Sequence, residues 1–351
     1  MELTRVGSEV GRQRADGYVV GAYAASPTLA GWDERLEADF YETLASDPRI
    51  GALELPWAGA LHPHDEDWLF AHLPARFDVV LTDVGHVYLT GLKRPHFGIA
   101  AVDEDERVAA LSDVRRMRDD VMRLNDARGR RVTRAVELHA GPRGNLSSAA
   151  SLARSLSDLA DWNWDGAELV LEHCDALVPG HAPEKGFLRL ADELEAVRRS
   201  RADVGIGINW GRSALELRDP ERVVDHIESA RDAGKLRALV FSGASAEAGY
   251  AAKPWSDVHN MFRRSPAHPH GDPVSLLTGE RAREALQAAP PGVWLGVKLW
   301  WPPQRPGSVS DRATMIADAL DELDSARGHR DPDNRLEHRS KTQHVPGIIQ
   351  R

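Results

Sequence analysis

The sequence has few of the features that mark a disulfide-bonded, membrane-spanning or nucleic-acid-binding protein. Its 351 residues include a single cysteine, Cys174, so no disulfide can form within the chain, and we expect a reducing compartment, the cytoplasm. No apolar run approaches the roughly 20 residues of a membrane helix, and residues 1–20 lack the apolar centre of a signal peptide. Acidic side chains outnumber basic ones by 54 to 44, and the net charge of −10 disfavours a phosphate backbone as the main partner. We therefore expect a small-molecule partner, and neither a membrane nor a nucleic acid.

Eight short apolar stretches, rich in valine, leucine and isoleucine, predict buried β-strands. They cover residues 18–26, 51–57, 77–83, 134–140, 169–175, 204–210, 236–242 and 293–300. Segments with the spacing of amphipathic helices separate them, among them 33–45, 103–128, 147–160, 219–234, 276–289 and 308–327. Strand and helix therefore alternate along most of the chain.

This alternation predicts parallel strand pairing through right-handed crossovers, and eight such units close most simply into a TIM barrel. The predicted fold class is α/β, a single-domain (β/α)8 TIM barrel over residues 17–327. An open, doubly wound sheet is the alternative, but no glycine-rich phosphate-binding turn follows the first predicted strand. We expect an N-terminal extension over residues 1–16, a long loop over about 246–275 and a polar C-terminal tail over 328–351.

Polar side chains occur where the predicted strands end, which is where TIM barrels carry their chemistry. They are Glu54, Glu137, His139, Glu172, Asn209, Ser242 and Lys298. Because alternate residues of a strand share a face, Glu137 and His139 should both point into the barrel, and the same rule should turn Glu172 inward. Burial of unpaired charges costs several kcal/mol, so such a cluster is typical of a binding or catalytic site. The alternative for each of these residues is a structural one, in which its charge neutralises a neighbouring charge and takes no part in binding or catalysis.

Three tryptophans and two basic residues lie in the segments that follow the strands. Trp57, Trp210 and Trp300 either stack on the C–H faces of sugar rings or plug the mouth of the barrel as core residues. Lys185 lies in a loop over 179–187, where a substrate-closing loop is expected, and Arg143 lies just beyond the fourth strand. The candidate substrate-binding residues are these five together with Glu54, Asn209, Arg212 and Ser242.

Several segments resemble xylose isomerase-like TIM barrels, a superfamily that includes sugar isomerases and epimerases. The run VGIGINWGRSALE followed by LRALVFSG is similar to their sixth and seventh strands, and LVLEHCD is similar to the strand that carries their first metal-binding glutamate. More narrowly, ALELPW, VELHAGPR, PGHAPEKGF and FSGASAE resemble an uncharacterised family of such barrels. The resemblance covers about residues 17–325 and implies the barrel fold and a carbohydrate or sugar derivative as partner. It leaves a homo-oligomer open, because superfamily members often form dimers or tetramers.

The resemblance also implies where a divalent metal would bind, and most of those ligands are replaced. The superfamily's metal enzymes use a glutamate on strand five, an aspartate on strand six with a histidine three residues later, a histidine on strand seven and a glutamate on strand eight. Glu172 matches the first ligand, but the others are replaced by Asn209, Arg212, Ser242 and Lys298. Two cationic side chains at ligand positions repel a divalent ion. The cofactor therefore stays unassigned, with Glu172 and His139 as the metal ligands if a metal binds.

Three functions are open at this point. The first is a sugar isomerase or epimerase-like enzyme that moves a proton next to the carbonyl of a small polyhydroxylated substrate, anionic or neutral. Its catalytic residues would be Glu172, Glu137, His139 and Lys298. The second is an aldolase-type lyase in which Lys298 forms a Schiff base, which requires a lowered lysine pKa. The third is a carbohydrate-binding barrel without catalysis, suggested by the replaced metal ligands.

Overall fold

The chain forms a closed barrel of eight parallel strands. The computed structural model describes residues 17–251 and 253–328; the expected extension over 1–16 and the expected tail beyond Gly328 lie outside the described residues. Consecutive strands are neighbours, and β8 pairs in parallel with β1 to close the sheet. The strands are β1 (Tyr18–Val20), β2 (Ile50–Pro56), β3 (Asp78–Thr82), β4 (Thr133–Leu138), β5 (Glu168–His173), β6 (Val204–Asn209), β7 (Leu236–Phe241) and β8 (Trp294–Val297). The predicted (β/α)8 TIM barrel is confirmed.

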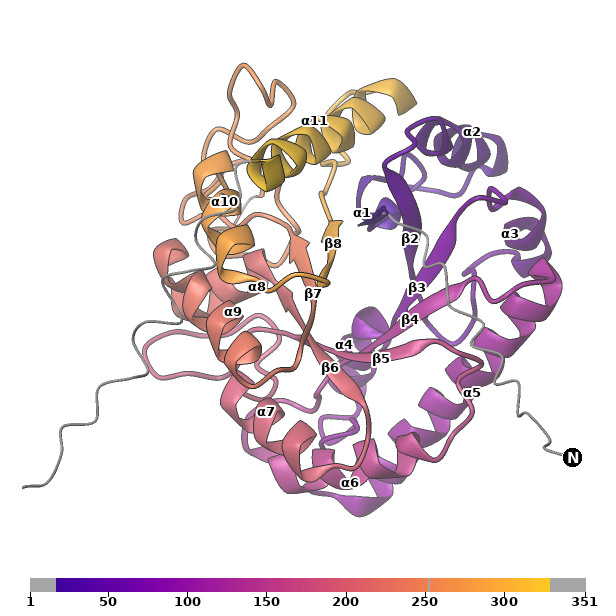
Figure 1. Cartoon of the computed structure of the whole chain (residues 1–351), viewed down its shortest axis with the longest axis vertical. Coiled ribbons are helices and arrows are strands. Elements are labelled where there is room, and N and C mark those ends of the chain that lie inside the picture. The colour runs from indigo at the N-terminus through magenta and orange to yellow at the C-terminus, as the bar shows by residue number, and fades with distance from the viewer. Residues whose placement is uncertain (1–16, 252, 329–351) are drawn as a thin grey trace, which may run out of the picture.

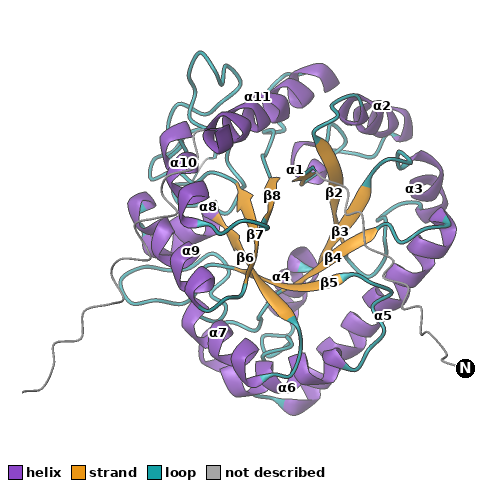
Figure 2. Ribbon diagram, viewed as in Figure 1, coloured by secondary structure: helices purple, strands orange, loops and turns teal. Residues whose placement is uncertain are grey.

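Helices surround the barrel, and α11 lies beside α2, so the last described helix meets the first long helix and completes the ring (Figures 1 and 2). The α-helices are α1 (Ala22–Ala25), α2 (Glu34–Ala45), α3 (Glu66–His72), α4 (Val84–Lys93), α5 (Glu104–Arg128), α6 (Ala149–Ala160), α7 (Leu190–Arg199), α8 (Trp210–Leu217), α9 (Val223–Asp232), α10 (Gly279–Ala288) and α11 (Val309–Gly328). Two short 3-10 helices are η1 (Gly144–Leu146) and η2 (Pro220–Arg222). None of the described helices has both the length and the apolar character needed to cross a membrane.

Capping side chains set the helix boundaries that the sequence predicts best. The Asp103 carboxylate accepts hydrogen bonds from the first backbone N–H groups of α5, and the helix ends at Gly129, whose φ of 62° is in the left-handed region. The first predicted strand, 18–26, is too long: β1 ends at Val20, and α1 begins at Ala22. Four further helices, α3, α4, α7 and α8, lie outside the segments whose spacing predicted helices.

The interior of the barrel has an apolar lower layer, which we call the barrel floor. It is a cluster of buried side chains separate from the larger core between strands and helices. Its members are Val19, Ala52, Val80, Ala135, Val170, Ala238, Val240 and Trp294. Because alternate residues share a face, a side chain two positions beyond a floor residue also enters the interior, nearer the C-terminal ends of the strands. The floor therefore fixes which side chains line the upper interior.

One long irregular segment, residues 242–278, connects β7 to α10. It includes the predicted long loop and folds back on itself through isolated bridges between Gly243 and Asn260 and between Arg263 and Asp272. We call it the long loop. Its start, at the end of β7, places it at the mouth of the barrel.

Candidate functional site

A layer of ionisable and polar side chains lies directly above the barrel floor. Glu54, Glu137 and Glu172 each stand two residues beyond a floor residue on β2, β4 and β5. Asn209 ends β6, and Lys298 directly follows β8. None of these five residues exposes more than 1% of its surface. The sequence predicted all five, and the structure brings them together.

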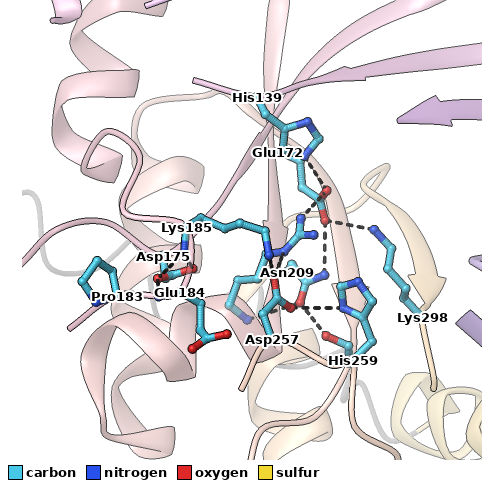
Figure 3. Close-up of polar contacts among 12 residues, drawn as sticks. His139, Glu172, Asp175, Pro183, Glu184, Lys185, Asn209, Asp257, His259 and Lys298 are labelled. Atoms are coloured by element: carbon cyan, nitrogen blue, oxygen red, sulfur yellow. Dashed lines mark hydrogen bonds and ion pairs between the residues drawn. The ribbon is translucent and has the colours of Figure 1, made fainter. Parts of the chain in front are cut away.

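Glu172 is the hub of this layer (Figure 3). Its Oε2 lies 2.9 Å from His139 Nε2 and forms an ion pair of 2.6 Å with Arg212. Its Oε1 accepts a hydrogen bond from Asn209 Nδ2 at 3.2 Å and lies 3.3 Å from Lys298 Nζ. Burial opposes ionisation, but the charges of Arg212 and Lys298 and the bond from His139 outweigh it and hold the pKa of Glu172 well below its usual value. Glu172 is therefore a carboxylate at neutral pH.

Lys298 connects Glu172 to a second carboxylate. Its Nζ lies 2.7 Å from Glu54 Oε1, which also accepts a hydrogen bond from the Tyr23 hydroxyl at 3.3 Å. Burial alone would lower the pKa of Lys298, but the negative charges of Glu172 and Glu54 raise it well above its usual value. Lys298 is therefore an ammonium group held between the carboxylate of Glu172 and the carboxyl group of Glu54, whose own pKa is raised by burial.

His139 extends the network toward β3. Its Nδ1 lies 2.7 Å from Asp83 Oδ1, so the ring is fixed between Asp83 and Glu172. Burial would lower the pKa of His139, but the bonds to these two carboxylates raise it above its usual value. Asp83 directly follows β3, and its contact orients the ring of His139.

Glu137 differs from its neighbours because its carboxyl group has no hydrogen-bond partner among the described residues. Burial and the nearby negative charges of Glu172 and Glu54 raise its pKa well above the usual value. Thr82, its neighbour across the β3–β4 ladder, also has a buried hydroxyl without a partner among the described residues. Two adjacent side chains thus offer unused hydrogen-bonding groups to a ligand.

Asn209 joins the cluster to the start of α8. Its Oδ1 accepts hydrogen bonds from Ser242 Oγ at 2.6 Å and from the backbone N–H groups of Gly211 at 3.1 Å and Arg212 at 3.4 Å. The Asn209 side chain thereby caps α8, and this first turn carries Arg212 toward Glu172. Asparagine at this position is therefore both a hydrogen-bond donor to Glu172 and a helix cap.

Two loops cover the cluster. Asp257, in the long loop, accepts a hydrogen bond from Lys185 Nζ at 2.9 Å and from Arg212 Nε at 3.2 Å (Figure 3). His259 lies 3.5 Å from the same carboxylate. Asp257 was not predicted, because an aspartate in an irregular loop has no periodicity that would indicate its direction. Its pKa is held well below the usual value because Lys185 and Arg212 outweigh the effect of burial.

The loop over 179–187 is fixed by its own contacts. The Asp175 carboxylate accepts the backbone N–H groups of Glu184 at 2.6 Å and of Lys185 at 3.1 Å. Arg143 is exposed and donates to the backbone carbonyls of Pro183 and Glu184, each at 3.4 Å. The structure thus places Arg143 on the outside of this loop, while Lys185 points toward Asp257.

The tryptophans lie away from the charged cluster. The indole N–H of Trp57 donates to Asp120 of α5 at 2.7 Å, and the side chain is buried. Of the two alternatives for Trp57, this contact favours the core residue over the ring that stacks on sugar. Trp210 is buried in the core between barrel and helices, and Trp300 is half-buried with its backbone N–H bonded to the carbonyl of His259 at 2.7 Å.

A cavity of about 260 Å³ lies next to the cluster, at the C-terminal ends of β1 and β2. Tyr23, Trp32, Pro56, His62 and His64 are among its lining residues. Tyr23 is only partly buried, and its hydroxyl contacts Glu54, so this side chain separates the cavity from the cluster. The volume lies below the ~300–1,000 Å³ of pockets for drug-sized ligands and suits a smaller molecule.

Comparison with known proteins identifies the family. A model of the domain of unknown function DUF4862 matches residues 19–315. An uncharacterised protein of Salmonella typhimurium is 37% identical over 289 residues, which cover 81% of this chain and 89% of that protein. The family model covers the eight strands, apart from Tyr18 at the start of β1, and the residues of the charged cluster.

Solved structures match the fold at low sequence identity. A putative xylose isomerase from Rhodospirillum rubrum has a TM-score of 0.54 at 13% identity, covering 88% of this chain and 98% of that one. A xylose isomerase domain protein from Alicyclobacillus acidocaldarius has a TM-score of 0.51 at 16% identity, covering 89% and 99%. The IolI protein with a bound zinc atom has a TM-score of 0.54 at 11% identity, covering 88% and 99%. The chain therefore belongs to the DUF4862 family and has the fold of the xylose isomerase-like TIM barrels.

Proposed function

We propose that the chain is a sugar isomerase or epimerase-like enzyme that transfers a proton next to the carbonyl of a small polyhydroxylated substrate. The observation that carries the proposal is the pair Glu137 and Glu172, two carboxyl groups in one layer whose pKa values are shifted in opposite directions. A neutral acid beside an ionised carboxylate is the arrangement that supplies an acid and a base at the same pH. The xylose isomerase-like fold supports the class of reaction but does not choose the substrate.

Each residue of the charged cluster would have its own role in the proposed proton transfer. Glu172 takes the proton from the carbon next to the carbonyl, and Glu137 gives its proton to the carbonyl oxygen, so an enediol forms and the total number of protons is unchanged. Return of the proton from Glu172 to the neighbouring carbon, with transfer of that carbon's hydroxyl proton to Glu137, completes an isomerisation. An epimerisation requires that the returning proton comes from a group on the opposite face of the enediol. Arg212 and Lys298 stabilise the developing negative oxygen, and His139 keeps Glu172 in position. When Arg212 or Lys298 turns toward the substrate, the pKa of Glu172 rises, and Glu172 becomes a stronger base.

Fixed cations, in this proposal, replace a metal ion. A divalent ion next to Glu172 would have to share the carboxylate with Arg212 at 2.6 Å and with Lys298 at 3.3 Å. Hard divalent ions prefer several anionic oxygens, and the ammonium and guanidinium groups at this place repel them. The residues of the barrel cluster therefore do not fit the divalent metal of the superfamily, and the proposed mechanism uses no metal ion.

The substrate would approach from the cavity beside Tyr23. Glu137, Glu172 and Lys298 have no exposed surface, so a ligand reaches them only after a covering side chain moves. Tyr23 is bonded to Glu54 by one long hydrogen bond of 3.3 Å, which makes it the side chain that is easiest to displace. Lys185 and Arg212 both pair with Asp257, and a carboxylate or phosphate of an anionic sugar derivative would bind them in place of Asp257. The single buried cysteine supports our placing of this reaction in the cytoplasm.

The Schiff-base lyase is less well supported than proton transfer. A Schiff-base lysine must lose its proton to become a nucleophile, whereas the two carboxylates around Lys298 raise its pKa. A carbohydrate-binding barrel without catalysis is the competing proposal, because the complete burial of the cluster also fits a purely structural charge network.

Solvent deuterium exchange tests the proposal without knowledge of the product. The chain is incubated in deuterated water with ketoses, aldoses, inososes, uronates and their phosphates, and incorporation of deuterium next to the carbonyl is followed by NMR. We expect exchange with at least one compound, a loss of about 100-fold or more in Glu137→Gln, and unchanged exchange in Glu42→Gln, which alters an exposed glutamate of α2. Ligands that raise the melting temperature but exchange no deuterium would support the binding barrel and overturn the enzyme.

A further inference from the structure

A second cluster of ionisable side chains lies outside the barrel, behind β5. His173 follows Glu172 on the strand, and consecutive residues point to opposite faces, so its ring enters the layer between barrel and helices. There it meets Glu193 of α7, Glu216 of α8 and His226 of α9, three helices that lie next to one another in the outer ring (Figure 1). None of these four side chains takes part in the proton transfer proposed above.

The contacts fix both histidine rings. His173 Nδ1 lies 2.7 Å from Glu193 Oε2, and its Nε2 lies 3.1 Å from Glu216 Oε2. His226 Nδ1 lies 3.1 Å from Ser213 Oγ, and its Nε2 lies 3.8 Å from Glu216 Oε1. One ligand atom each of His173, Glu216 and His226 therefore lies within 4.8 Å of the other two.

This arrangement is that of a metal site with its supporting contacts. Metal-binding histidines use one ring nitrogen for the ion and hold the other against a carboxylate, a carbonyl or another hydrogen-bonding group, which fixes the ring. Here the Nδ1 atoms of both rings are held by Glu193 and Ser213, and both Nε2 atoms face the same carboxylate. Two imidazoles and one carboxylate are a common zinc ligand set, with a fourth position left to water.

We propose that His173, Glu216 and His226 bind one first-row divalent cation, best represented by Zn²⁺, outside the barrel. Imidazole and carboxylate ligands favour this class of ion over Mg²⁺ or Ca²⁺. Glu216 and His226 keep 7% and 11% of their side chains exposed, so the site is near the surface. The ion ties β5, α8 and α9 together. The proposal does not depend on the proposed enzyme activity.

Metal retention by the whole chain is the test. The chain is stripped with a chelator, equilibrated with Zn²⁺ and dialysed, and bound zinc is measured by mass spectrometry together with the melting temperature. We expect one zinc per chain, a higher melting temperature with zinc, and loss of the bound zinc in His226→Gln. His181→Gln is the matched control, because His181 also contacts Glu216 but only its backbone carbonyl, and this variant should keep its zinc.

Three results would overturn the proposal. They are no retained zinc in the unaltered chain, equal zinc in His226→Gln, or loss of zinc in Glu172→Gln, which would place the ion inside the barrel. If His226→Gln fails to fold, zinc X-ray absorption on the unaltered chain decides, because the proposal requires two imidazole ligands and oxygen.

Discussion

Arg212 and Glu172 form an ion pair of 2.6 Å in which neither side chain exposes more than 1% of its surface. Each charge is tolerated in this buried position because the other is present, since removal of one partner from a buried pair leaves an uncompensated charge in a poorly solvated site. The stability of the fold and the proposed chemistry therefore depend on the same contact.

Arg212→Met should lower the free energy of unfolding by about 3–5 kcal/mol, because Glu172 and Asp257 both lose a cationic partner. Urea denaturation of the two proteins measures the difference. Arg143→Met is the matched control: Arg143 is exposed, its two contacts are long, and its loss should cost about 0.5 kcal/mol or less. Equal losses in the two variants would contradict the central role of the Arg212 pair.

Glu137→Gln should change how stability depends on pH. Burial and nearby carboxylates raise the pKa of Glu137 above 4.5, so above pH 4.5 the unfolded chain gives up a proton that the folded chain keeps. Ionisation then favours the unfolded state, and the stability of the unaltered chain falls by up to about 1.4 kcal/mol per pH unit until pH passes the folded pKa. Glutamine lacks this proton. The stability of Glu137→Gln minus that of the unaltered chain should therefore rise from pH 5 to pH 8.

The control for this pH series is Glu42→Gln, which removes an exposed carboxyl group of α2 outside the cluster. A flat difference for Glu137→Gln would mean that Glu137 is ionised in the folded chain. The assignment of Glu137 as proton donor would then be wrong.

Borohydride reduction in the presence of ketoses and aldehydes should add no mass at Lys298. The neighbouring Glu172 and Glu54 carboxylates keep this side chain protonated despite its burial, and an ammonium group is not a nucleophile. Peptide mass spectrometry after reduction measures the outcome. A reduced adduct on Lys298 would instead support the Schiff-base lyase, which the sequence left open as an alternative function.

Gly21→Ala should disturb Lys298 without altering any charged residue. A Cβ atom at Gly21 would lie 2.7 Å from Lys298 Cγ, so the lysine stem must shift and its ammonium group must move relative to Glu54 and Glu172. We expect deuterium exchange to fall about 10- to 100-fold, because small displacements of a catalytic group are costly. Gly31→Ala is the control, since no atom lies within 4 Å of its added Cβ, and it should exchange normally.

The strand ends could be predicted from the sequence because two local rules apply to them. Short apolar stretches located the strands, and the alternation of side chains along a strand predicted that Glu137 and Glu172 face the interior. The same rule placed His139, two residues beyond Glu137. Their mutual contacts follow from barrel closure, which brings the ends of all strands to one rim.

Contacts made by loops and by residues beyond strand ends could not be predicted in this way. Trp57 turns toward Asp120, which lies 63 residues later on α5, and no local pattern indicates that pairing. Asp257 covers Arg212 from an irregular segment without periodicity. The cluster around His173 was also missed, because its partners come from three different helices.

The apolar barrel floor and the polar layer above it have separate tasks. Small and branched side chains of the barrel floor, such as Ala52, Ala135 and Val170, pack the interior of the closed sheet. The polar groups that would meet a substrate lie in the layer above the floor. In the proposed enzyme, substitutions of Glu137 or Ser242 can therefore alter which molecule is bound, while the packing of the barrel floor stays intact. Relatives with the same barrel floor and a different polar layer would be expected to share this architecture and to differ in the molecules they recognise.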